Sequence, residues 1–392
     1  MQRRALASRS ASSVASMASC SHGRYHAFPF QRRPSRQKPK RPSPYLSLWQ
    51  GSSRPLSTLS AILTPLAVFC ALVVSLWAYK CLMMVVFQNK IIYMPSVPPF
   101  SRSERMENYA ASCKPIAWRS ETIRSLDGTK LTLAIGENVT MQQQQRVSSK
   151  CPALVVVYFQ GNASSLPPRM PGLSSVLKQL DNSIEPIACT LIALSYRGFW
   201  TSSGRASQAG IEKDAAATID WANEMRSRHS AETKLVLWGQ SIGAGVATTA
   251  AANWLSIPLG KTQRNCPQCN TTDKIDALLL ETPFTSVENM LASLYPQRWL
   301  PYRYLGPFLW NHWDSPQALQ TIRGTPGAKV PVLIATASKD EVVPPDQGED
   351  LVKLCKRLGL DTRHRIVTDA LHTEVLAKSQ GRKVIVDFLR AI

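Results

Sequence analysis

A serine flanked by glycines follows directly on a short apolar run. The pentapeptide GQSIG at 239–243 comes after residues 235–238, and the small residues 244–247 are typical of the start of a helix. A nucleophile on a tight strand-to-helix turn needs unusual backbone angles, so the residues two positions to either side must be small. The first N–H groups of such a helix point to where negative charge develops. The motif alone is a modest signal, but this strand and helix context makes Ser241 our candidate nucleophile.

Apolar segments alternate with helix-like segments from about residue 115 onward. This alternation is typical of an α/β fold with a largely parallel sheet. Residues 116–123 and 131–135 flank a turn at Asp127-Gly128 and predict an opening hairpin. The valine-rich run 153–159 has the unbroken apolar pattern of a strand buried on both faces. Further strands are predicted at 190–195, 235–238, 277–280, 332–335 and 365–367.

Helices and polar segments complete this pattern. Ser207 is a candidate N-cap for a helix whose apolar residues recur at helical spacing, and residues 384–392 are predicted to close the chain as a helix. The Gln-rich stretch 142–150 and the polar stretch 256–274 are predicted as loops. The aromatic-rich segment 286–316 is predicted as a packed lid over the sheet. The alternative for this segment, a wall of an apolar acyl pocket beside Ser241, stays open.

Basic residues are concentrated at the N-terminus. Residues 1–60 hold eleven Lys and Arg and no Asp or Glu, which is more than half of the formal net charge of +20. A segment rich in Ser, Arg and Pro cannot form a core, so residues 1–58 are predicted to be a disordered leader. No basic surface interleaved with aromatic residues follows it, and we therefore predict no nucleic-acid partner.

An uncharged apolar run from Leu59 to Tyr79 has about the ~20 residues that a bilayer requires. Only Pro65 interrupts it, and a second apolar stretch follows Lys80. The run is too long and too far from the start for a cleaved signal peptide, and nothing nearby could enclose it as a core helix. We predict a transmembrane helix over 59–87 that contacts the lipid bilayer. A linker over 88–114 and a catalytic domain over 115–392 are predicted to follow.

Membrane orientation follows from the charges that flank this helix. The long basic leader favours a cytosolic N-terminus. We therefore predict a single-pass protein of the endomembrane system, in the endoplasmic reticulum, with a lumenal catalytic domain. Sequons at Asn138 and Asn270 suit a lumenal domain, whereas Lys80 and Lys90 weaken the charge bias. A leader with Arg and Ser but no acid is also typical of a mitochondrial presequence, so a mitochondrial membrane stays open.

A serine hydroxyl needs a base, and the base needs a carboxylate that orients it. Asp340 follows the predicted strand 332–335 by a short loop, and Glu341 is the rival acid. Of the six histidines, His372 follows the last predicted strand by a loop and precedes the closing helix. This order of Ser, acid and His along the chain predicts a triad of Ser241, Asp340 and His372.

The oxyanion that forms during acyl transfer needs two backbone N–H donors. We expect them from Ile242, beside the nucleophile, and from Asn162, where Gly161 permits a close backbone approach after the strand 153–159. Cys266 and Cys269 have the spacing of half a zinc site. Because no second pair exists, we predict no metal and no cofactor, and a loop disulfide or two free thiols remain open.

These residues together resemble the Bem-type (bud-emergence-related) α/β-hydrolases, membrane-anchored serine hydrolases akin to the animal α/β-hydrolase-domain membrane proteins. The resemblance implies an α/β-hydrolase fold, a mostly parallel sheet with helices on both faces. Two departures stand out: the family usually has His at Gln160 and a small residue at Trp200, where Trp is expected to narrow the acyl entrance. The resemblance covers about residues 85–392 and rests on the motifs at 87–95, 159–163, 196–198, 239–243, 282–286 and 338–340.

We therefore predict a membrane-anchored serine hydrolase that cleaves a carboxylic ester or thioester through an acyl-Ser241 intermediate. Tethering beside a bilayer favours a lipid or an acylated protein as substrate. A serine peptidase or amidase is an alternative, because the same triad cleaves amides. A membrane scaffold that keeps the fold without turnover is the alternative outside enzymology, since a fold does not fix a function.

Overall fold

The computed structural model describes residues 56–147, 153–182, 184–228, 233–257 and 274–392. It divides into two units, Met1–Ile62 and Leu63–Ile392, and the sheet and all contacts discussed below lie in the second. The predicted leader lies almost entirely outside the described residues. Cys266, Cys269 and the sequon at Asn270 also lie outside them.

Eight strands of the described chain form one sheet in the order β1-β2-β4-β3-β5-β6-β7-β8. β1 and β2 pair as an antiparallel hairpin, β2 pairs antiparallel with β4, and the remaining neighbours are parallel. The predicted hairpin and the mostly parallel sheet are confirmed. The strands are β1 (Ala117–Arg124), β2 (Lys130–Glu137), β3 (Ala153–Phe159), β4 (Ala188–Ser195), β5 (Lys234–Gln240), β6 (Ala277–Glu281), β7 (Val332–Ala337) and β8 (Thr362–Val367).

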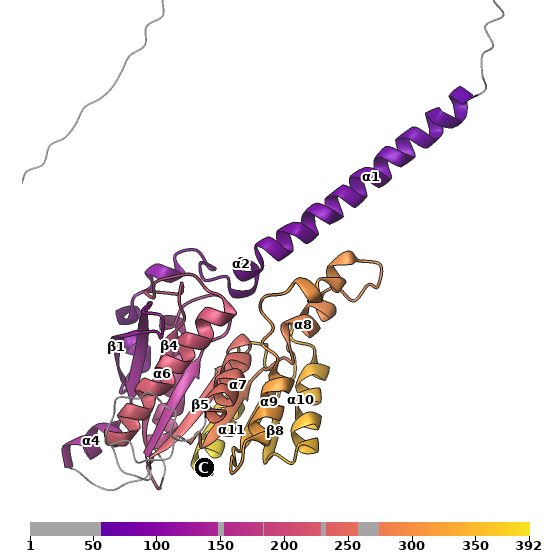
Figure 1. Cartoon of the computed structure of the whole chain (residues 1–392). Coiled ribbons are helices and arrows are strands. Elements are labelled where there is room, and N and C mark those ends of the chain that lie inside the picture. The colour runs from indigo at the N-terminus through magenta and orange to yellow at the C-terminus, as the bar shows by residue number, and fades with distance from the viewer. Residues whose placement is uncertain (1–55, 148–152, 183, 229–232, 258–273) are drawn as a thin grey trace, which may run out of the picture. The chain divides into compact units, whose positions relative to one another are not determined.

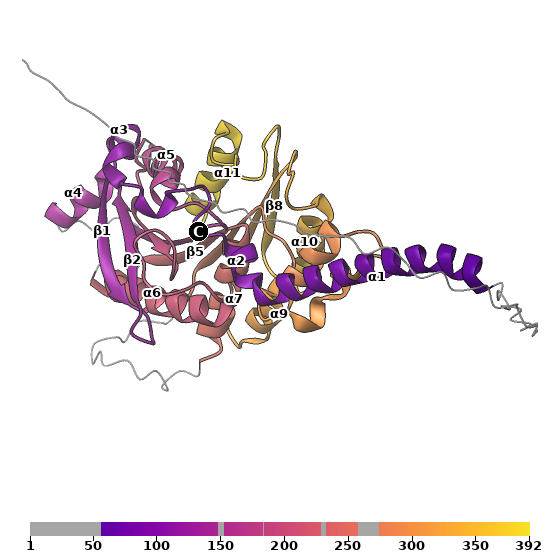
Figure 2. The ribbon, with the colours of Figure 1, turned by 90° about the horizontal axis from the view of Figure 1, so that it is seen from above.

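Helices cover both faces of this sheet, as Figure 1 and Figure 2 show. Alternate side chains of β3 supply the two cores: Val155 and Val157 belong to one, and Val156 and Tyr158 to the other. A strand buried on both faces is apolar along its whole length, which is why β3 was recognisable in the sequence. The first core is covered by α6 (Gln208–Arg228), α7 (Ile242–Leu255), α9 (Ser315–Gly324) and α10 (Pro345–Arg357), and the second by α5 (Met170–Asp181) and α11 (Ser379–Arg390).

The predicted cap of α6 is present, because the Ser207 Oγ accepts a hydrogen bond from the Gly210 N–H at 3.3 Å. The closing helix begins earlier and ends sooner than predicted, at the bounds of α11 given above. The predicted apolar face of α6 packs against the first core through Ile211, Ala215, Ile219, Ala222 and Met225.

The stretch predicted as a loop at 142–150 is helical up to residue 147, in α4 (Val139–Val147). Asn138 Oδ1 accepts from the Met141 N–H at 3.0 Å, and the Asp181 carboxylate accepts from two further N–H groups of the first turn. These acceptors satisfy the donors that a helix start leaves unpaired, and glutamine is a good helix former. The prediction was wrong because one of the acceptors comes from α5, far along the sequence.

The sequon at Asn138 is closed to modification in the folded chain. Its side chain is fully buried, and its amide donates to the Ile187 carbonyl at 2.7 Å. Its Oδ1 also accepts from the Cys189 N–H at 2.9 Å. A glycan on this nitrogen would replace the hydrogen bond and would not fit the core, so this sequon gives no support to a lumenal domain.

The N-terminal helix α1 (Leu56–Val86) contains a stretch, Ile62–Val86, that is long and apolar enough to cross a membrane. None of the side chains of that stretch is buried and most are exposed, so protein covers little of its apolar surface. Residues 88–114 form α2 (Gln88–Tyr93), α3 (Ala110–Cys113) and two 3₁₀ turns. Helix α2 is joined to the rest of the fold, because the buried Tyr93 hydroxyl donates to Asn311 Oδ1 at 2.8 Å.

Candidate active site

Ser241 occupies the sharp turn between β5 and α7. Its backbone has φ 54° and ψ −120°, a conformation that costs free energy for any residue with a side chain. A Cβ on Gly243 would lie 2.0 Å from the Phe159 carbonyl oxygen, and one on Gly239 would lie 2.0 Å from the Gly243 carbonyl oxygen. The spacing of the two glycines therefore has a steric cause: the turn brings backbone against backbone on both sides of the serine.

The structure brings Ser241, His372 and Asp340 together in one chain of hydrogen bonds. His372 Nε2 lies 2.8 Å from Ser241 Oγ, and His372 Nδ1 lies 2.8 Å from Asp340 Oδ2 and 3.0 Å from Oδ1. The three residues follow β5, β7 and β8, parallel strands of one sheet in which β6 lies between β5 and β7, so their carboxyl ends lie at the same edge. An ionised Asp340 fixes the proton on Nδ1 and leaves Nε2 to accept from the serine hydroxyl.

The carboxylate of Asp340 is held in its ionised form. Burial alone would raise the pKa of Asp340, but hydrogen bonds from His372 and from two backbone N–H groups outweigh it and lower that pKa below its ordinary value. Val342 and Val343 donate these bonds to Asp340 Oδ1 at 2.9 and 2.7 Å. Glu341 has a different place, because its carboxylate accepts from the backbone N–H of His372 at 2.9 Å. Of the two rival acids, the structure places Asp340 on the imidazole ring.

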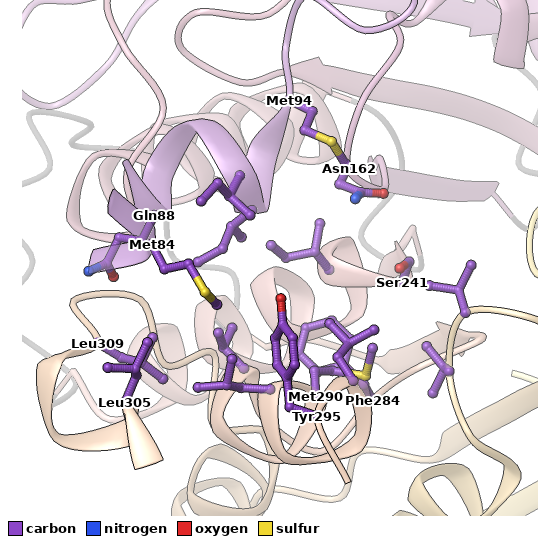
Figure 3. A pocket seen from close by; sticks show the side chains of 18 of the residues that line it. Met84, Gln88, Met94, Asn162, Ser241, Phe284, Met290, Tyr295, Leu305 and Leu309 are labelled. Carbon is purple, nitrogen blue, oxygen red and sulfur yellow. The ribbon is translucent and has the colours of Figure 1, made fainter. Parts of the chain in front are cut away.

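The loop after β3 lies over the serine. A Cβ on Gly161 would approach Ser241 Cβ and the Gln240 carbonyl to 3.5 Å, so this loop runs in contact with the turn. Asn162 and Ile242 line the same cavity as Ser241. Figure 3 shows the Asn162 and Ser241 side chains near each other on one side of that cavity. The three residues predicted to form an oxyanion site thus lie beside the serine.

An apolar cavity of about 290 Å³ opens beside Ser241. In Figure 3, Met84, Gln88 and Leu309 lie on the side of the cavity opposite Ser241. Its walls come from the end of α1, from α2, from α8 (Val287–Leu294) and from the residues that follow α8. The segment 286–316 therefore lines the cavity. This agrees with the alternative given for this segment in the sequence analysis, a wall of an apolar pocket beside Ser241, rather than with a lid alone. The residues that this segment contributes are Val287, Met290, Leu291, Leu294, Tyr295, Leu305 and Leu309.

Comparison with known proteins finds relatives among α/β-hydrolase-domain proteins. No family model matches the sequence. Protein bem46 of Schizosaccharomyces pombe is 28% identical over 269 residues, which cover 69% of this chain and 75% of that protein. The lysophosphatidylserine lipase ABHD12 of Danio rerio is 28% identical over 249 residues, 60% of this chain and 58% of that protein. This chain is a relative of the Bem-type α/β-hydrolase-domain proteins.

The fold agrees with that relationship. The crystal structure of an α/β-hydrolase from Vibrio vulnificus superposes with a TM-score of 0.53 at 16% identity, covering 78% of this chain and 92% of that one. At this identity the likeness establishes the fold alone. An α/β-hydrolase fold and Bem-type relatives together support a hydrolase activity for this chain.

The structure locates Gln160 and Trp200, the two residues expected from the resemblance to depart from the family pattern. Trp200 is buried, its Nε1–H donates to the Glu104 carbonyl at 2.8 Å, and it belongs to the core under α5 and α11. It is not among the residues that line the Ser241 cavity, so the expectation that it narrows the acyl entrance is wrong. Gln160 is fully buried, and its carbonyl accepts from the Tyr196 hydroxyl at 2.8 Å, which anchors the loop over the serine.

A buried polar network beneath the serine was not foreseen from the sequence. Glu281, at the end of β6, is fully buried and accepts from Trp238 Nε1–H at 3.0 Å and from the Gln240 amide at 3.2 Å. The Arg169 guanidinium and the Tyr158 hydroxyl donate to Gln240 Oε1. Burial raises the pKa of Glu281 to about 7. One feature of the sequence could have indicated this network: Glu281 is an acidic residue at the end of an otherwise apolar strand, β6.

The network and the nucleophile share one backbone contact. The Ser241 N–H donates to the Glu281 carbonyl at 2.8 Å. The end of β6 therefore holds the strained turn from below, while the loop at 160–162 contacts it from above. Both supports are formed by residues at or just after the ends of strands, Glu281 at the end of β6 and residues 160–162 after β3.

Proposed function

We propose that this chain is a membrane-anchored serine hydrolase that cleaves a carboxylic ester or thioester through an acyl-Ser241 intermediate. The observation that carries the proposal is the chain of hydrogen bonds from Ser241 Oγ through His372 to Asp340, at the side of an apolar cavity. A serine paired with an imidazole and a carboxylate in this way can give up its proton as it attacks.

In the first step, His372 Nε2 takes the Ser241 proton while Oγ attacks the carbonyl carbon of the substrate. The negative charge on the resulting oxyanion is stabilised by the backbone N–H groups of Ile242 and Asn162. As the tetrahedral intermediate collapses, the imidazolium returns the proton to the leaving alcohol or thiol, and Ser241 keeps the acyl group. Water then attacks the acyl carbonyl carbon as it loses a proton to the same imidazole. The second tetrahedral intermediate breaks its bond to Ser241 Oγ, which takes that proton back, and the acid is released. Asp340 stays ionised throughout and stabilises the imidazolium.

The cavity supports a substrate with one apolar acyl chain. Its lining is dominated by Met, Leu, Ile and Val side chains, and its volume of about 290 Å³ is small for a ligand site. A relative is named as a lysophosphatidylserine lipase, an enzyme for a single-chain lipid. We therefore propose a single-chain lipid ester as the substrate class, with acylated protein as the second class to test.

We further propose that α1 crosses the membrane, that the N-terminus is cytosolic and that the catalytic domain lies in the lumen of the endoplasmic reticulum. The basic leader and the uncovered apolar surface of α1 support this arrangement. The measurement is protease protection in sealed microsomes. Digestion of the catalytic domain without detergent would place it on the cytosolic side instead.

The first prediction concerns the nucleophile. The full-length chain is expected to react covalently with a fluorophosphonate probe, and Ser241→Ala is expected to lose all labelling, because the Ser241 hydroxyl is paired with the His372 imidazole as its base. Ser203→Ala is the matched control: Ser203 is an exposed loop serine, and its variant is expected to label like the parent. The readout is in-gel fluorescence of the membrane fraction.

Labelling that persists in Ser241→Ala would assign the nucleophile to another residue. A folded parent chain that does not label at all would favour the non-catalytic scaffold. If labelling behaves as expected, hydrolysis of lysophospholipids and acyl thioesters of increasing chain length identifies the preferred substrate. Hydrolysis of amides of the same acyl chains would favour the peptidase or amidase alternative.

A further inference from the structure

The segment from Leu294 to Trp310, here called the aromatic loop, presents large apolar side chains to the outside. It contains the end of α8 and two 3₁₀ turns, Pro301–Tyr304 and Gly306–Phe308. Soluble proteins rarely gather so many exposed aromatic rings in one short segment unless the surface binds something. The exposed side chains, each between 58% and 67% accessible, are Leu294, Trp299, Tyr304, Phe308 and Trp310.

The aromatic loop contacts helix α1 at two levels. The rings of Trp77 and Trp299 lie 5.8 Å apart. Lys80 Nζ lies 4.2 Å from the centroid of the Tyr302 ring and 5.3 Å from that of Tyr295. A cation over an aromatic face is attracted by the ring quadrupole. The loop thus supplies partners for a lysine within the apolar stretch of α1.

These contacts fix the level of the aromatic loop along α1. Helix α1 has 31 residues. At about 1.5 Å per residue it is about 46 Å long, whereas a hydrocarbon core is about 30 Å thick. The excess of about 16 Å must lie outside the hydrocarbon core. Because a charged lysine is costly inside that core, the end of α1 that contains Lys80 is the end that lies outside it. Residues up to about Trp77 then fill the core, and Trp77, Lys80 and the aromatic loop lie at the headgroup level, where Trp, Tyr and Lys concentrate in membrane proteins.

The charge of the aromatic loop suits the same environment. No Asp or Glu occurs between Glu288 and Asp314, whereas Arg298 and Arg303 both lie in the loop. Arg298 is exposed and free to reach a phosphate. Arg303 donates to the carbonyls of Ala292 and Pro296 and holds the loop in shape. Basic residues beside apolar ones are attracted to the negative surface of a phospholipid leaflet.

We propose that the aromatic loop is a second membrane contact, lying in the headgroup region of the leaflet from which α1 emerges. The loop also lines the Ser241 cavity through Leu294, Tyr295 and Leu305. Its burial in the interface therefore holds the cavity against that leaflet, so that a single-chain lipid passes from the bilayer to Ser241 without crossing bulk water. The proposal rests on the proposed crossing of the membrane by α1, and is independent of the proposed acyl-Ser241 chemistry.

The test uses the full-length chain in vesicles of phosphatidylcholine and phosphatidylserine. Benzoylphenylalanine, which cross-links on illumination to the groups it touches, is placed singly at Trp299, Phe308 or Trp310. Leu72, an exposed residue of the α1 apolar stretch, is the positive control. Ile184, exposed just before β4, is the negative control, because it lies at the sheet edge opposite to Ser241. The products are separated by mass spectrometry into lipid adducts and protein adducts.

Lipid adducts are expected at all three loop positions and at Leu72, and none at Ile184. Lipid adducts at Leu72 alone would overturn the proposal, because the catalytic domain would then stand away from the leaflet. Adducts that join two copies of the chain at the loop positions would overturn it in favour of a dimer interface. A lack of lipid adducts at Leu72 as well would remove the membrane span and the proposal with it, while fluorophosphonate labelling of Ser241 would still report the catalytic proposal separately.

Discussion

Asp340 and Glu341 are adjacent carboxylates that the fold uses differently. The side chain of Asp340 meets the imidazole ring of His372, whereas the side chain of Glu341 meets the backbone N–H of the same residue. The first contact sets which ring nitrogen carries the proton, and the second sets where the loop lies. Single substitutions at the two positions therefore separate tautomer control from loop position.

Asp340→Asn is expected to lower the rate of ester hydrolysis by about 10⁴-fold, because an amide at this position favours the tautomer in which Nε2 cannot accept the serine proton. Glu341→Gln is the matched control. It loses at most one hydrogen bond, worth about 1 kcal/mol, so a fall of no more than about tenfold is expected. Hydrolysis of a chromogenic short-chain ester measures both. Equal losses in the two variants would contradict the assignment of Asp340 as the orienting acid.

Chain order was enough to nominate Ser241, Asp340 and His372, because each follows a strand that the apolar pattern reveals. The buried network around Glu281 was not predictable in this way. Its members, Tyr158, Arg169 and Gln240, come from separate elements and meet only once the sheet has formed. No local spacing in the sequence marks them as neighbours.

At the scale of secondary structure, the turn between β5 and α7 is the most demanding element. It packs the start of a helix directly against the backbone of β3, which is why both flanking positions are glycine. The turn can form only because the hydrogen bond from the Ser241 N–H to Glu281 and the packing of α7 offset the strain at Ser241.

Gly243→Ala is expected to destabilise the chain by about 3 kcal/mol or more, since its Cβ would lie 2.0 Å from the Phe159 carbonyl oxygen and a close-packed interior does not yield to an added methyl group. Gly324→Ala, at the end of α9, is the control. A Cβ there meets nothing within 4 Å, so unchanged stability or a gain of up to about 1 kcal/mol is expected. Thermal unfolding in detergent micelles measures both. A Gly243→Ala chain as stable as the parent would refute the steric account of the motif.

Helices and strands whose own residues show a hydrophobic period were predictable from the sequence. Elements that depend on contacts with residues distant in the sequence were not. The strands of the sheet and the apolar face of α6 show their period within the segment itself. Helix α4 consists largely of polar residues, with glutamine at 142–145, and its first turn depends on Asp181. The wall that residues 286–316 build around the Ser241 cavity also depends on tertiary packing, since aromatic residues in sequence do not say which surface they face.

For the molecule as a whole, Glu281 links stability to pH. Because burial raises its pKa to about 7, from an ordinary value of 4.5, the folded chain keeps a proton that the unfolded chain releases between these pH values. Stability therefore falls as pH rises through this interval, by about 3 kcal/mol at most. Its contribution is fully present below the ordinary pKa and is lost above pH 7.

The expected result is a melting temperature that falls more steeply between pH 5 and pH 8 in the parent chain than in Glu281→Gln, which has no group to titrate at this position. Differential scanning calorimetry of the detergent-solubilised chain measures the two profiles, and only their difference is assigned to Glu281. Parallel profiles would mean that Glu281 titrates alike in the folded and unfolded chains.

Helix α1 has an exposed apolar surface along most of its length and a protein contact at its end. Most of its length offers apolar surface with little protein cover, yet its last turn places Met84 and Val85 in the wall of the Ser241 cavity. The helix proposed to anchor the chain therefore also forms part of the cavity beside Ser241. A chain cut after α1 would lose a wall of its own cavity, so proteolytic release could not yield a soluble enzyme of the same specificity.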